Sequence, residues 1–357
     1  MAFVPQCLPT TIGSLPHADA REATELMLSY TPQIPAWVQL AKRPQEGMLV
    51  QFSEGLPGFH RSPGGDGYFD TDAPGFPEEV AALYQDYLAA FEGHAADHLE
   101  PYALTPAFAQ GFHALLEVLR RGEHRPLALK GQVTGPFTLA TSLTDQQRKS
   151  AYYHPQLRDI IVKIISLKAA WQIQQLSVYA TPVIISLDEP SLVGFGSSAY
   201  IGVTAADIQK DLDEIISCIH QGHAYASLHC CENTDWSMIL GTAIDILNFD
   251  AYSYFDKLLL YADSLRAFLA RGGILAWGLI PTAHHLQIRS ETRETLLHTW
   301  DSCLERLALH GIDPEQVIVQ SLITPSCGAG LLSPEDALRV LQLLRDVSQG
   351  LQNRHRN

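Results

Sequence analysis

The sequence predicts an α/β protein, a single (β/α)8 TIM barrel formed by residues 1–357. Short apolar runs alternate with amphipathic stretches at helical spacing, which is the pattern of parallel strands joined by crossover helices. Eight such runs occur, and 357 residues is an ordinary length for one barrel with insertions. Residues able to carry chemistry follow most of these runs, at the edge where barrel enzymes keep their active sites.

The predicted strands and helices alternate along the whole chain. Apolar stripes at helical spacing mark the helices, one running from Leu157 to Ile165 and another from Ala337 to Val347. Ser333, followed by a proline and two acids, should begin the last helix, and Thr204 should begin another. The predicted strands are Thr10 to Ser14, Ala36 to Leu40, Leu127 to Gly131, Val183 to Leu187, Ala224 to His229, Ile246 to Asp250, Ile274 to Gly278 and Val317 to Leu322.

The connection between the second and third strands is much longer than a crossover requires. Residues 41–76 are rich in Gly, Pro, Phe and Asp, and they predict a long ordered loop. Helices are expected next, at about 77–98 and 104–121. The barrel should therefore carry a long insertion between strands 2 and 3.

The composition excludes several classes of partner. A net charge of −15 repels phosphate backbones and anionic lipid, so neither nucleic acid nor a membrane is an expected partner. The first residues lack the pattern of a secretory signal, and no apolar run is long enough to span a bilayer. We expect a soluble, cytoplasmic protein whose six cysteines are reduced thiols.

Three separated residues form a candidate zinc site. His229 and Cys231 lie at the end of the fifth predicted strand, and Cys327 follows the eighth, in a Pro/Gly turn. Because side chains i and i+2 of a strand share a face, His229 and Cys231 can bind one ion while Cys230 faces away. Two thiolates and an imidazole suit zinc, and three protein ligands leave a position for substrate. The alternative is that these are ordinary core residues.

Short motifs recur at the ends of the predicted strands. They are Thr11-Ile-Gly-Ser-Leu-Pro, Gly131-Gln-Val-Thr-Gly-Pro-Phe-Thr, Leu187-Asp-Glu-Pro-Ser-Leu, Leu228-His-Cys-Cys, Asn248-Phe-Asp and Pro325-Ser-Cys-Gly. In this order, and over nearly the whole chain, they resemble the catalytic domain of cobalamin-independent methionine synthase. The wider relatives are uroporphyrinogen decarboxylase-like barrels, including zinc methyltransferases that pass methyl groups from corrinoid proteins to coenzyme M.

The resemblance implies a catalytic metal centre. His229, Cys231 and Cys327 would bind Zn²⁺. Asp250 falls where those synthases carry a glutamate that ligates zinc until the substrate thiol displaces it. Asp250 and Asp188 are accordingly the candidate catalytic residues.

The resemblance also implies a homocysteine site. Ile12, Gly13 and Ser14 would hold its carboxylate, while Asp188 and Glu54 would hold its ammonium. An amino acid does need an anion site, which a glycine turn can supply, and carboxylates for its cation. Structural interpretations remain open, since Asp188 could cap a helix, Gly13 and Ser14 could form only a tight turn, and Glu54 could be a solvated loop carboxylate.

The chain departs from the synthase pattern on the side of the methyl donor. The folate-dependent synthases carry a second, N-terminal barrel, for which this chain has no room. They also carry a tryptophan that stacks on folate, but none occurs between Gly135 and Leu143, and Trp277-Gly-Leu stands where they carry a histidine. We therefore expect methylcobalamin or a methylated corrinoid protein as the donor, ahead of methyl-tetrahydrofolate.

The sequence thus predicts a zinc-dependent methyltransferase that converts homocysteine to methionine. One alternative is the same chemistry on another thiol such as coenzyme M. A second is a metal-free, uroporphyrinogen decarboxylase-like enzyme, which would need basic residues around its cavity. A third is a protein with structural zinc, but such sites have four close-spaced ligands, unlike Cys231 and the distant Cys327.

Overall fold

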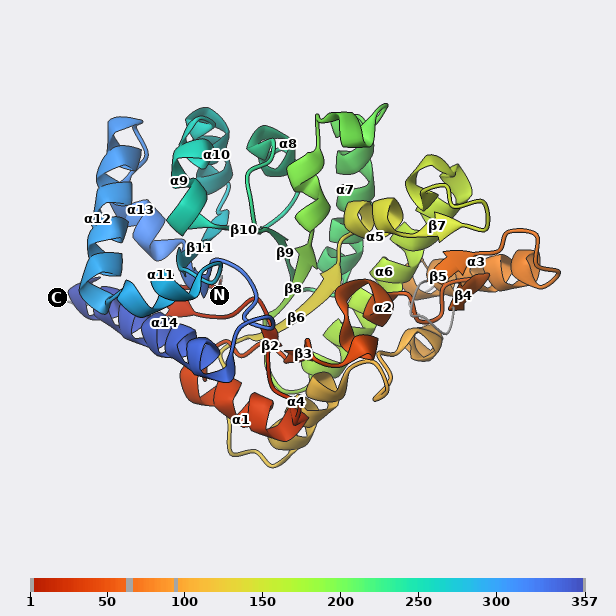
Figure 1. Ribbon diagram of the computed structural model, residues 1–357, viewed down its shortest axis with the longest axis horizontal. Coiled ribbons are helices and arrows are strands. Elements are labelled where there is room, and N and C mark those ends of the chain that lie inside the picture. The colour runs from red at the N-terminus through yellow and green to blue at the C-terminus, as the bar shows by residue number, and fades with distance from the viewer. Residues whose placement is uncertain (1–2, 62–66, 93–95, 356–357) are drawn as a thin grey trace.

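A curled parallel sheet forms the centre of the computed structural model, which describes residues 3–61, 67–92 and 96–355 (Figure 1). In this described part the sheet has seven strands in the order β1-β12-β11-β10-β9-β8-β6, so neighbours in the sheet mostly follow one another in the chain. The strands are β1 (Leu8–Pro9), β6 (Leu129–Thr134), β8 (Val183–Asp188), β9 (Tyr225–Cys230), β10 (Ile246–Phe249), β11 (Ile274–Ile280) and β12 (Ser321–Pro325).

A short strand pair lies between the two ends of this sheet. It consists of β2 (Ser14–Leu15) and β3 (Gln39–Leu40), which are parallel. On one side the Gln39 amide donates to the Gly13 carbonyl at 3.1 Å. On the other side Ala36 forms a parallel bridge to Lys130 of β6, and the Trp37 amide donates to the Lys130 carbonyl at 3.2 Å. Segment 36–40 is therefore hydrogen-bonded both to the chain after β1 and to β6.

Helices connect the strands and lie outside the sheet (Figure 1). None of those in the described ranges is both long and apolar enough to cross a membrane. The α-helices are α1 (Ala20–Tyr30), α2 (Met48–Phe52), α3 (Phe76–Phe91), α4 (Gln110–Arg120), α5 (Pro136–Ser142), α6 (Pro155–Leu176), α7 (Ala205–Gln221), α8 (Trp236–Leu240), α9 (Ala251–Leu259), α10 (Ala262–Ala270), α11 (His285–Ser290), α12 (Arg293–Leu309), α13 (Pro314–Val319) and α14 (Pro334–His355).

Two helix starts predicted from the sequence are confirmed by their caps. Thr204 Oγ1 accepts a hydrogen bond from the Asp207 amide at 3.1 Å at the start of α7. Ser333 Oγ accepts one from the Asp336 amide at 3.1 Å at the start of α14. In each case a side-chain oxygen satisfies an amide that has no partner within the helix.

The predicted strand Val317 to Leu322 is wrong in its first half. Residues 314–319 form α13, because Pro314 follows the capping Asp313, whose side chain accepts from the Glu315 amide. The strand β12 begins only at Ser321. An apolar run of this length suits a short helix and a buried strand equally, so its period could not separate the two.

Other predicted boundaries also shift. The first predicted strand is split into β1 and β2, with Gly13 at φ +139° between them, and the second is a regular strand only at Gln39–Leu40. The third lies two residues later than predicted, at β6. These changes leave the order of strands and helices as predicted.

The long connection before β6 is more structured than the predicted loop. It contains α2 and the antiparallel pair β4 (Phe59–Arg61) and β5 (Gly67–Phe69), while residues 62–66 lie outside the described residues. The predicted helix 77–98 is α3, which ends at Phe91. The helix expected from 104 begins at Gln110, after a separate turn in which the Phe108 and Ala109 amides donate to the Thr105 carbonyl. In Figure 1, α3 and the β4-β5 pair project to the right of the sheet.

The interior of the sheet changes from apolar to polar along the strands. In β8, for example, Ile184, Ser186 and Asp188 share the inner face because alternate residues of a strand point the same way. Ile184 packs at the start of the strands in an apolar cluster, whose other fully buried members are Ile34, Ala128, Ile246, Ile274, Ala276 and Leu322. The polar residues follow at the carboxyl ends, so this edge of the sheet is where a buried reactive site can form.

Candidate metal and substrate site

Strand alternation places neighbouring residues of β9 in different surroundings. Cys230 is fully buried in the main hydrophobic core together with Leu228, and burial raises the pKa of its thiol to about 12. His229 pairs in register with Asp188 of β8 and Asn248 of β10. Its side chain therefore lies on the inner, polar face, while Cys230 packs under the surrounding helices.

The three predicted metal ligands converge. The ligand atoms of His229, Cys231 and Cys327 all lie within 4.8 Å of one another. His229 Nε2 is 3.1 Å from Cys231 Sγ, and the sulfurs of Cys231 and Cys327 are 3.0 Å apart, longer than a disulfide bond. The half-buried Cys231 follows β9 directly and Cys327 lies two residues after β12, so the strands bring both to the same edge.

A glycine allows the strands to approach one another beside these ligands. A Cβ atom on Gly278 of β11 would lie 2.8 Å from the Ser326 Cα and 3.1 Å from the Asp250 Cα. A real Cβ atom is almost never found within 3.0 Å of backbone, so a larger residue here would push the segments apart. Gly278 thus lets the segment carrying Cys327 and the one carrying Asp250 come close.

The Cys231 and Cys327 thiols are hydrogen-bonded to one another, and this contact moves their pKa values in opposite directions. The hydrogen bond from Cys231 lowers the pKa of Cys327, with His229 adding to the effect, and the same contact raises the pKa of Cys231. Burial lowers the pKa of His229, but its hydrogen bond and attraction to Cys327 raise it overall. Two sulfurs and one imidazole fit a zinc ion with an open position, and among the described residues no fourth ligand joins this cluster.

Asp188 lies beside this cluster at the end of β8. Its carboxylate is buried and accepts a hydrogen bond from Ser186 Oγ at 2.9 Å. Burial raises its pKa, and the charges of Lys130 and His229 oppose that rise. Asp188 does not cap a helix in the described structure, whereas the neighbouring Glu189 caps the start of α5.

Glu189 has a structural role that was not predicted from the sequence. Its carboxylate accepts hydrogen bonds from the Phe137 and Thr138 amides at 2.9 and 2.7 Å, at the start of α5. Burial raises its pKa to about 7. A Cβ on Gly135 would lie 2.2 Å from the Glu189 carboxyl carbon, which explains why a glycine precedes this helix. The Asp-Glu-Pro motif therefore sends one carboxylate to the interior and the next to a helix end.

Asp250 caps the helix that follows β10. Its carboxylate accepts from the Ser253 amide at 2.8 Å at the start of α9. Burial raises its pKa, and the charge of Cys327 adds to the rise while His229 opposes it. Asp250 thus has a structural role, and it also lies within electrostatic reach of two predicted ligands.

The turn containing Gly13 and Ser14 packs against the loop of Cys327. Ser14 Oγ accepts from the Gly330 amide at 3.2 Å, and the Ser14 carbonyl accepts from the Ala329 amide at the same distance. Gly13 has a φ of +139°, and a Cβ there would meet the side chain of Gln132 at 2.8 Å. The predicted carboxylate site and the predicted metal ligand Cys327 are therefore neighbours.

Glu54 makes its contacts elsewhere. It follows α2, and its carboxylate accepts from Thr105 Oγ1 at 2.8 Å. The charged neighbours within its electrostatic reach include Lys168 and Arg61. The contacts described for Glu54 do not bring it to Asp188, so its predicted role at the ammonium stays a prediction.

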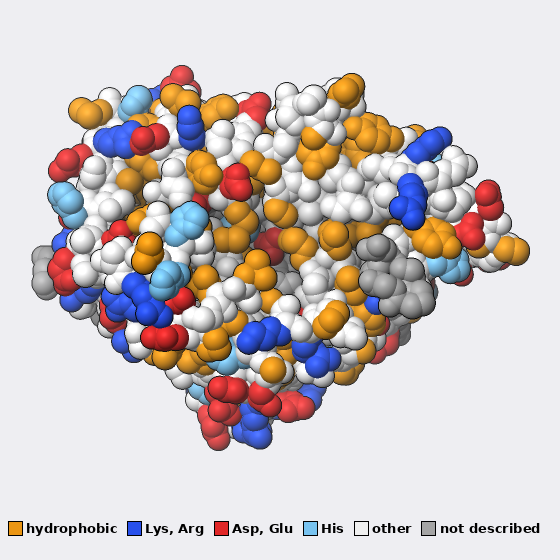
Figure 2. Space-filling view, in the orientation of Figure 1, with side chains coloured by type: hydrophobic (Ala, Val, Ile, Leu, Met, Phe, Trp, Pro, Cys, Tyr) orange, Lys and Arg blue, Asp and Glu red, His pale blue; other side chains and the backbone are white. Residues whose placement is uncertain are grey.

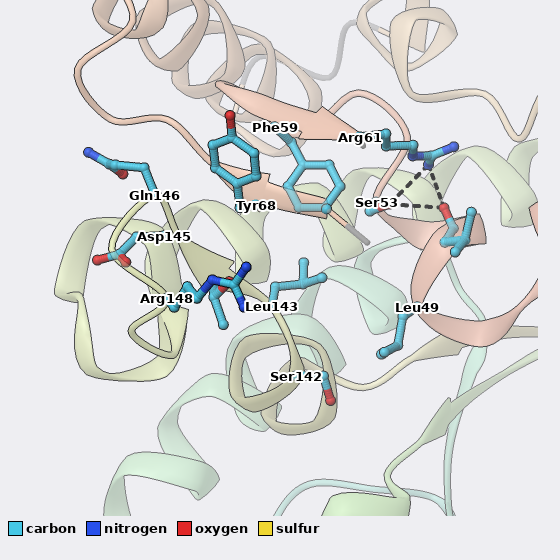
Figure 3. A pocket seen from close by; sticks show the side chains of 13 residues that line it. Leu49, Ser53, Phe59, Arg61, Tyr68, Ser142, Leu143, Asp145, Gln146 and Arg148 are labelled. Atoms are coloured by element: carbon cyan, nitrogen blue, oxygen red, sulfur yellow. Dashed lines mark hydrogen bonds between the residues drawn. The ribbon is translucent and has the colours of Figure 1, made fainter. Parts of the chain in front are cut away.

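A cavity of about 700 Å³ opens beside α5 (Figure 3). Figure 3 shows Phe59, Tyr68 and Leu143 together with the guanidinium groups of Arg61 and Arg148. Residues of α2, the β4-β5 pair and the α5-β7 segment line the cavity, where β7 is Thr144–Asp145.

Hydrophobic side chains gather around the middle of the face of the molecule shown in Figure 2, and an acidic group lies deeper among them.

Comparison with known proteins yields a likeness of fold. The chain matches no protein-family model and no curated protein. Among solved structures, a candidate vitamin-B12-independent methionine synthase from Listeria monocytogenes is 14% identical, with a TM-score of 0.50 over 94% of this chain and 85% of that one. It supports a shared α/β fold and nothing about activity.

Two further structures are similar at lower scores. A methyltransferase from Methanosarcina mazei is 16% identical, with a TM-score of 0.47 over 97% of this chain and 94% of that one. A B12-independent methionine synthase from Shewanella sp. W3-18-1, solved in complex with selenomethionine, is 17% identical, with a TM-score of 0.44 over 67% of each chain.

Proposed function

We propose that this chain is a zinc-dependent methyltransferase that converts homocysteine to methionine, built as one (β/α)8 barrel over residues 1–357. Segments 8–15 and 36–40 would close the barrel, and the residues from 41 to the start of β6 would be its insertion. The observation that carries the proposal is the convergence of His229, Cys231 and Cys327 at the carboxyl edge of the strands, within 4.8 Å of one another.

The three ligands would hold zinc and leave one position for the substrate sulfur. Bound zinc would keep that sulfur as a thiolate near neutral pH, when a free thiol is mostly protonated. The chain's own contribution is to bring two thiols and an imidazole together near buried Asp188 and Asp250. We propose that Asp250 gives way to the incoming thiol, as its position beside the cluster allows.

The residues around the cluster suit an amino-acid thiol. Buried Asp188 would pair with the ammonium group, with Glu54 as a second predicted partner, and Ile12, Gly13 and Ser14 would hold the carboxylate. An ion pair in a site with little water is stronger and more selective than one at the surface. The same two buried acids, Asp188 and Asp250, disfavour coenzyme M, whose sulfonate is negative and which has no ammonium.

We propose a methylated corrinoid as the donor. The thiolate sulfur would attack the methyl carbon, the new S–C bond would form as the C–Co bond breaks, and cobalt would keep the electron pair. The cavity beside α5 offers Arg61 and Arg148 to anionic or amide-rich groups of such a donor. Trp277, where the synthases carry a histidine, is fully buried in the core and offers the donor nothing.

The test is turnover by the purified protein. With zinc and homocysteine, methylcobalamin or a methylated corrinoid protein should give methionine, measured by mass spectrometry, and methyl-tetrahydrofolate should give negligible product. Cys327→Ser is the matched negative control. Methionine from the folate and none from the corrinoid would overturn the donor, and no methionine from either would overturn the function.

A further inference from the structure

Lys130 is a buried lysine at the base of the candidate site. It belongs to β6, is 6% exposed, and its Nζ donates a hydrogen bond to the Ile12 carbonyl at 2.7 Å. Asp188 attracts its charge, yet in the described part of the chain no carboxylate lies within 4.0 Å of the Lys130 ammonium. The closest recorded partner of this ammonium is therefore a peptide carbonyl of the Ile12–Gly13 turn.

Burying an ammonium group without a close counter-ion is costly. The cost is visible in the pKa of Lys130, which burial lowers to about 8 against the opposing pull of Asp188. Beneath it the barrel interior is almost filled, since the small cavity lined by Lys130, Ile12 and Asn248 has a volume of about 10 Å³. That is room for one water at most, so no substrate group can approach the Lys130 ammonium through this cavity.

The Ile12–Gly13 peptide can transmit the influence of the Lys130 charge to the candidate substrate site. In a trans peptide the carbonyl and the amide N–H point in opposite directions, so the Gly13 N–H faces away from Lys130. Within the described residues this N–H has no hydrogen-bond acceptor, and the bond that Lys130 makes to the Ile12 carbonyl polarises the whole peptide. A polarised, unpaired N–H beside Ser14 and the Cys327 loop is a donor suited to an anion.

We propose that Lys130 is a positioning residue for the carboxylate of the amino-acid substrate, acting through the Ile12–Gly13 peptide. The inference rests on the proposed function, since it names how the homocysteine carboxylate is recognised. Lys130 would fix the turn and strengthen the Gly13 N–H without touching the substrate. The lysine lies within the predicted apolar run Leu127 to Gly131, and a charged residue in such a run is the signal that sequence analysis could have used.

The experiment compares two thiols in Lys130→Met, a variant of similar length without charge. Homocysteine has a carboxylate and 3-mercaptopropylamine lacks it, while both keep the ammonium and the thiol. Lys130→Met should raise the KM for homocysteine about tenfold, the effect of one charge-assisted hydrogen bond, and leave kcat and the KM for 3-mercaptopropylamine unchanged. Lys130→Gln, which keeps a donor, should recover part of the loss.

Lys168→Met is the matched control. Lys168 is also buried, at 1% exposed, and burial also lowers its pKa to about 8, but it lies on α6. This variant should leave the ratio of kcat/KM for the two thiols as in the wild type. The ratio does not depend on how much of a preparation is folded, so it remains informative if Lys130→Met is poorly stable.

The outcomes separate the inference from the function. Suppose that the wild type methylates homocysteine but Lys130→Met lowers kcat/KM equally for both thiols, or for neither. The proposed role of Lys130 is then wrong, and the proposed function stands. If wild type methylates neither thiol, the proposed function itself fails. Binding of methionine and of 3-(methylthio)propylamine, measured by calorimetry, gives the same comparison without turnover, and a selective loss of methionine binding in Lys130→Met supports the role.

Discussion

Asp188→Asn tests how the site would select an amino-acid thiol. The substitution keeps the volume of the side chain and an oxygen that can accept the 2.9 Å hydrogen bond from Ser186 Oγ. It removes the negative charge from a carboxylate that is 6% exposed and lies beside His229, one of the proposed zinc ligands. The loss should therefore fall on a bound ammonium rather than on packing.

The expected magnitude follows from the burial. A hydrogen bond to a charged group contributes about 1.5 to 3 kcal/mol, and about 1.4 kcal/mol corresponds to a factor of ten. Asp188→Asn should therefore lower kcat/KM for homocysteine by about 10- to 150-fold. The assay compares homocysteine with 4-mercaptobutyrate, which has the same carboxylate and thiol but no amino group.

The result for 4-mercaptobutyrate decides the interpretation. Its kcat/KM should change little in Asp188→Asn, and the zinc content should match that of the wild type. Asp245→Asn, which removes a charge that accepts from the Ala226 amide at the other end of β9, is the matched control and should preserve the discrimination. An equal loss for both thiols in Asp188→Asn would refute the reasoning.

Three further predictions concern the surroundings of the site. Below about pH 8, Lys168 is charged in both the folded and the unfolded chain, and burying that charge destabilises the fold. Lys168→Met should therefore raise the free energy of unfolding, measured by chemical denaturation, by up to about 3 kcal/mol below about pH 8. The gain should fade as the pH rises toward 10.5, and a gain that does not depend on pH would contradict the prediction. Arg148→Gln should raise the KM for the methyl donor without changing that for homocysteine, whereas an unchanged donor KM would remove the cavity beside α5 from the mechanism. If Glu54 binds the ammonium group, Glu54→Gln should raise the KM for homocysteine and leave the KM for 4-mercaptobutyrate unchanged. If the variant only lowers the melting temperature, Glu54 acts through its hydrogen bond with Thr105 and not on the substrate.

The sequence predicted the order of strands and helices well because their signals are local. Caps at Thr204 and Ser333 and the apolar stripes of α6 and α14 depend only on neighbouring residues. The run at 317–322 failed because a short apolar segment suits a helix and a strand alike. The second strand is shorter than predicted. Its pairing depends on partners far away in the sequence, Ser14–Leu15 on one side and Lys130 on the other, which no local pattern reveals.

The candidate site divides in the same way. Strand alternation was enough to place His229 inward and Cys230 outward, and the position of Cys327 after a strand brought it to the same edge. Lys130 and Glu189 were missed because their roles depend on contacts to Ile12 and to the start of α5, far away in sequence. Glu54 was assigned through resemblance alone, and its recorded partner, Thr105, belongs to the long connection that no local pattern could place.

The most direct test of the central claim is the zinc content of purified protein. Elemental analysis of wild type should give about one zinc per chain, Cys327→Ser should lose most of it, and Cys230→Ser should keep it, because Cys230 packs in the core away from the cluster. X-ray absorption at the zinc edge should show two sulfur neighbours and one nitrogen in the wild type. Full zinc occupancy in Cys327→Ser, or a wild-type protein that binds no zinc when it is supplied, would contradict the account.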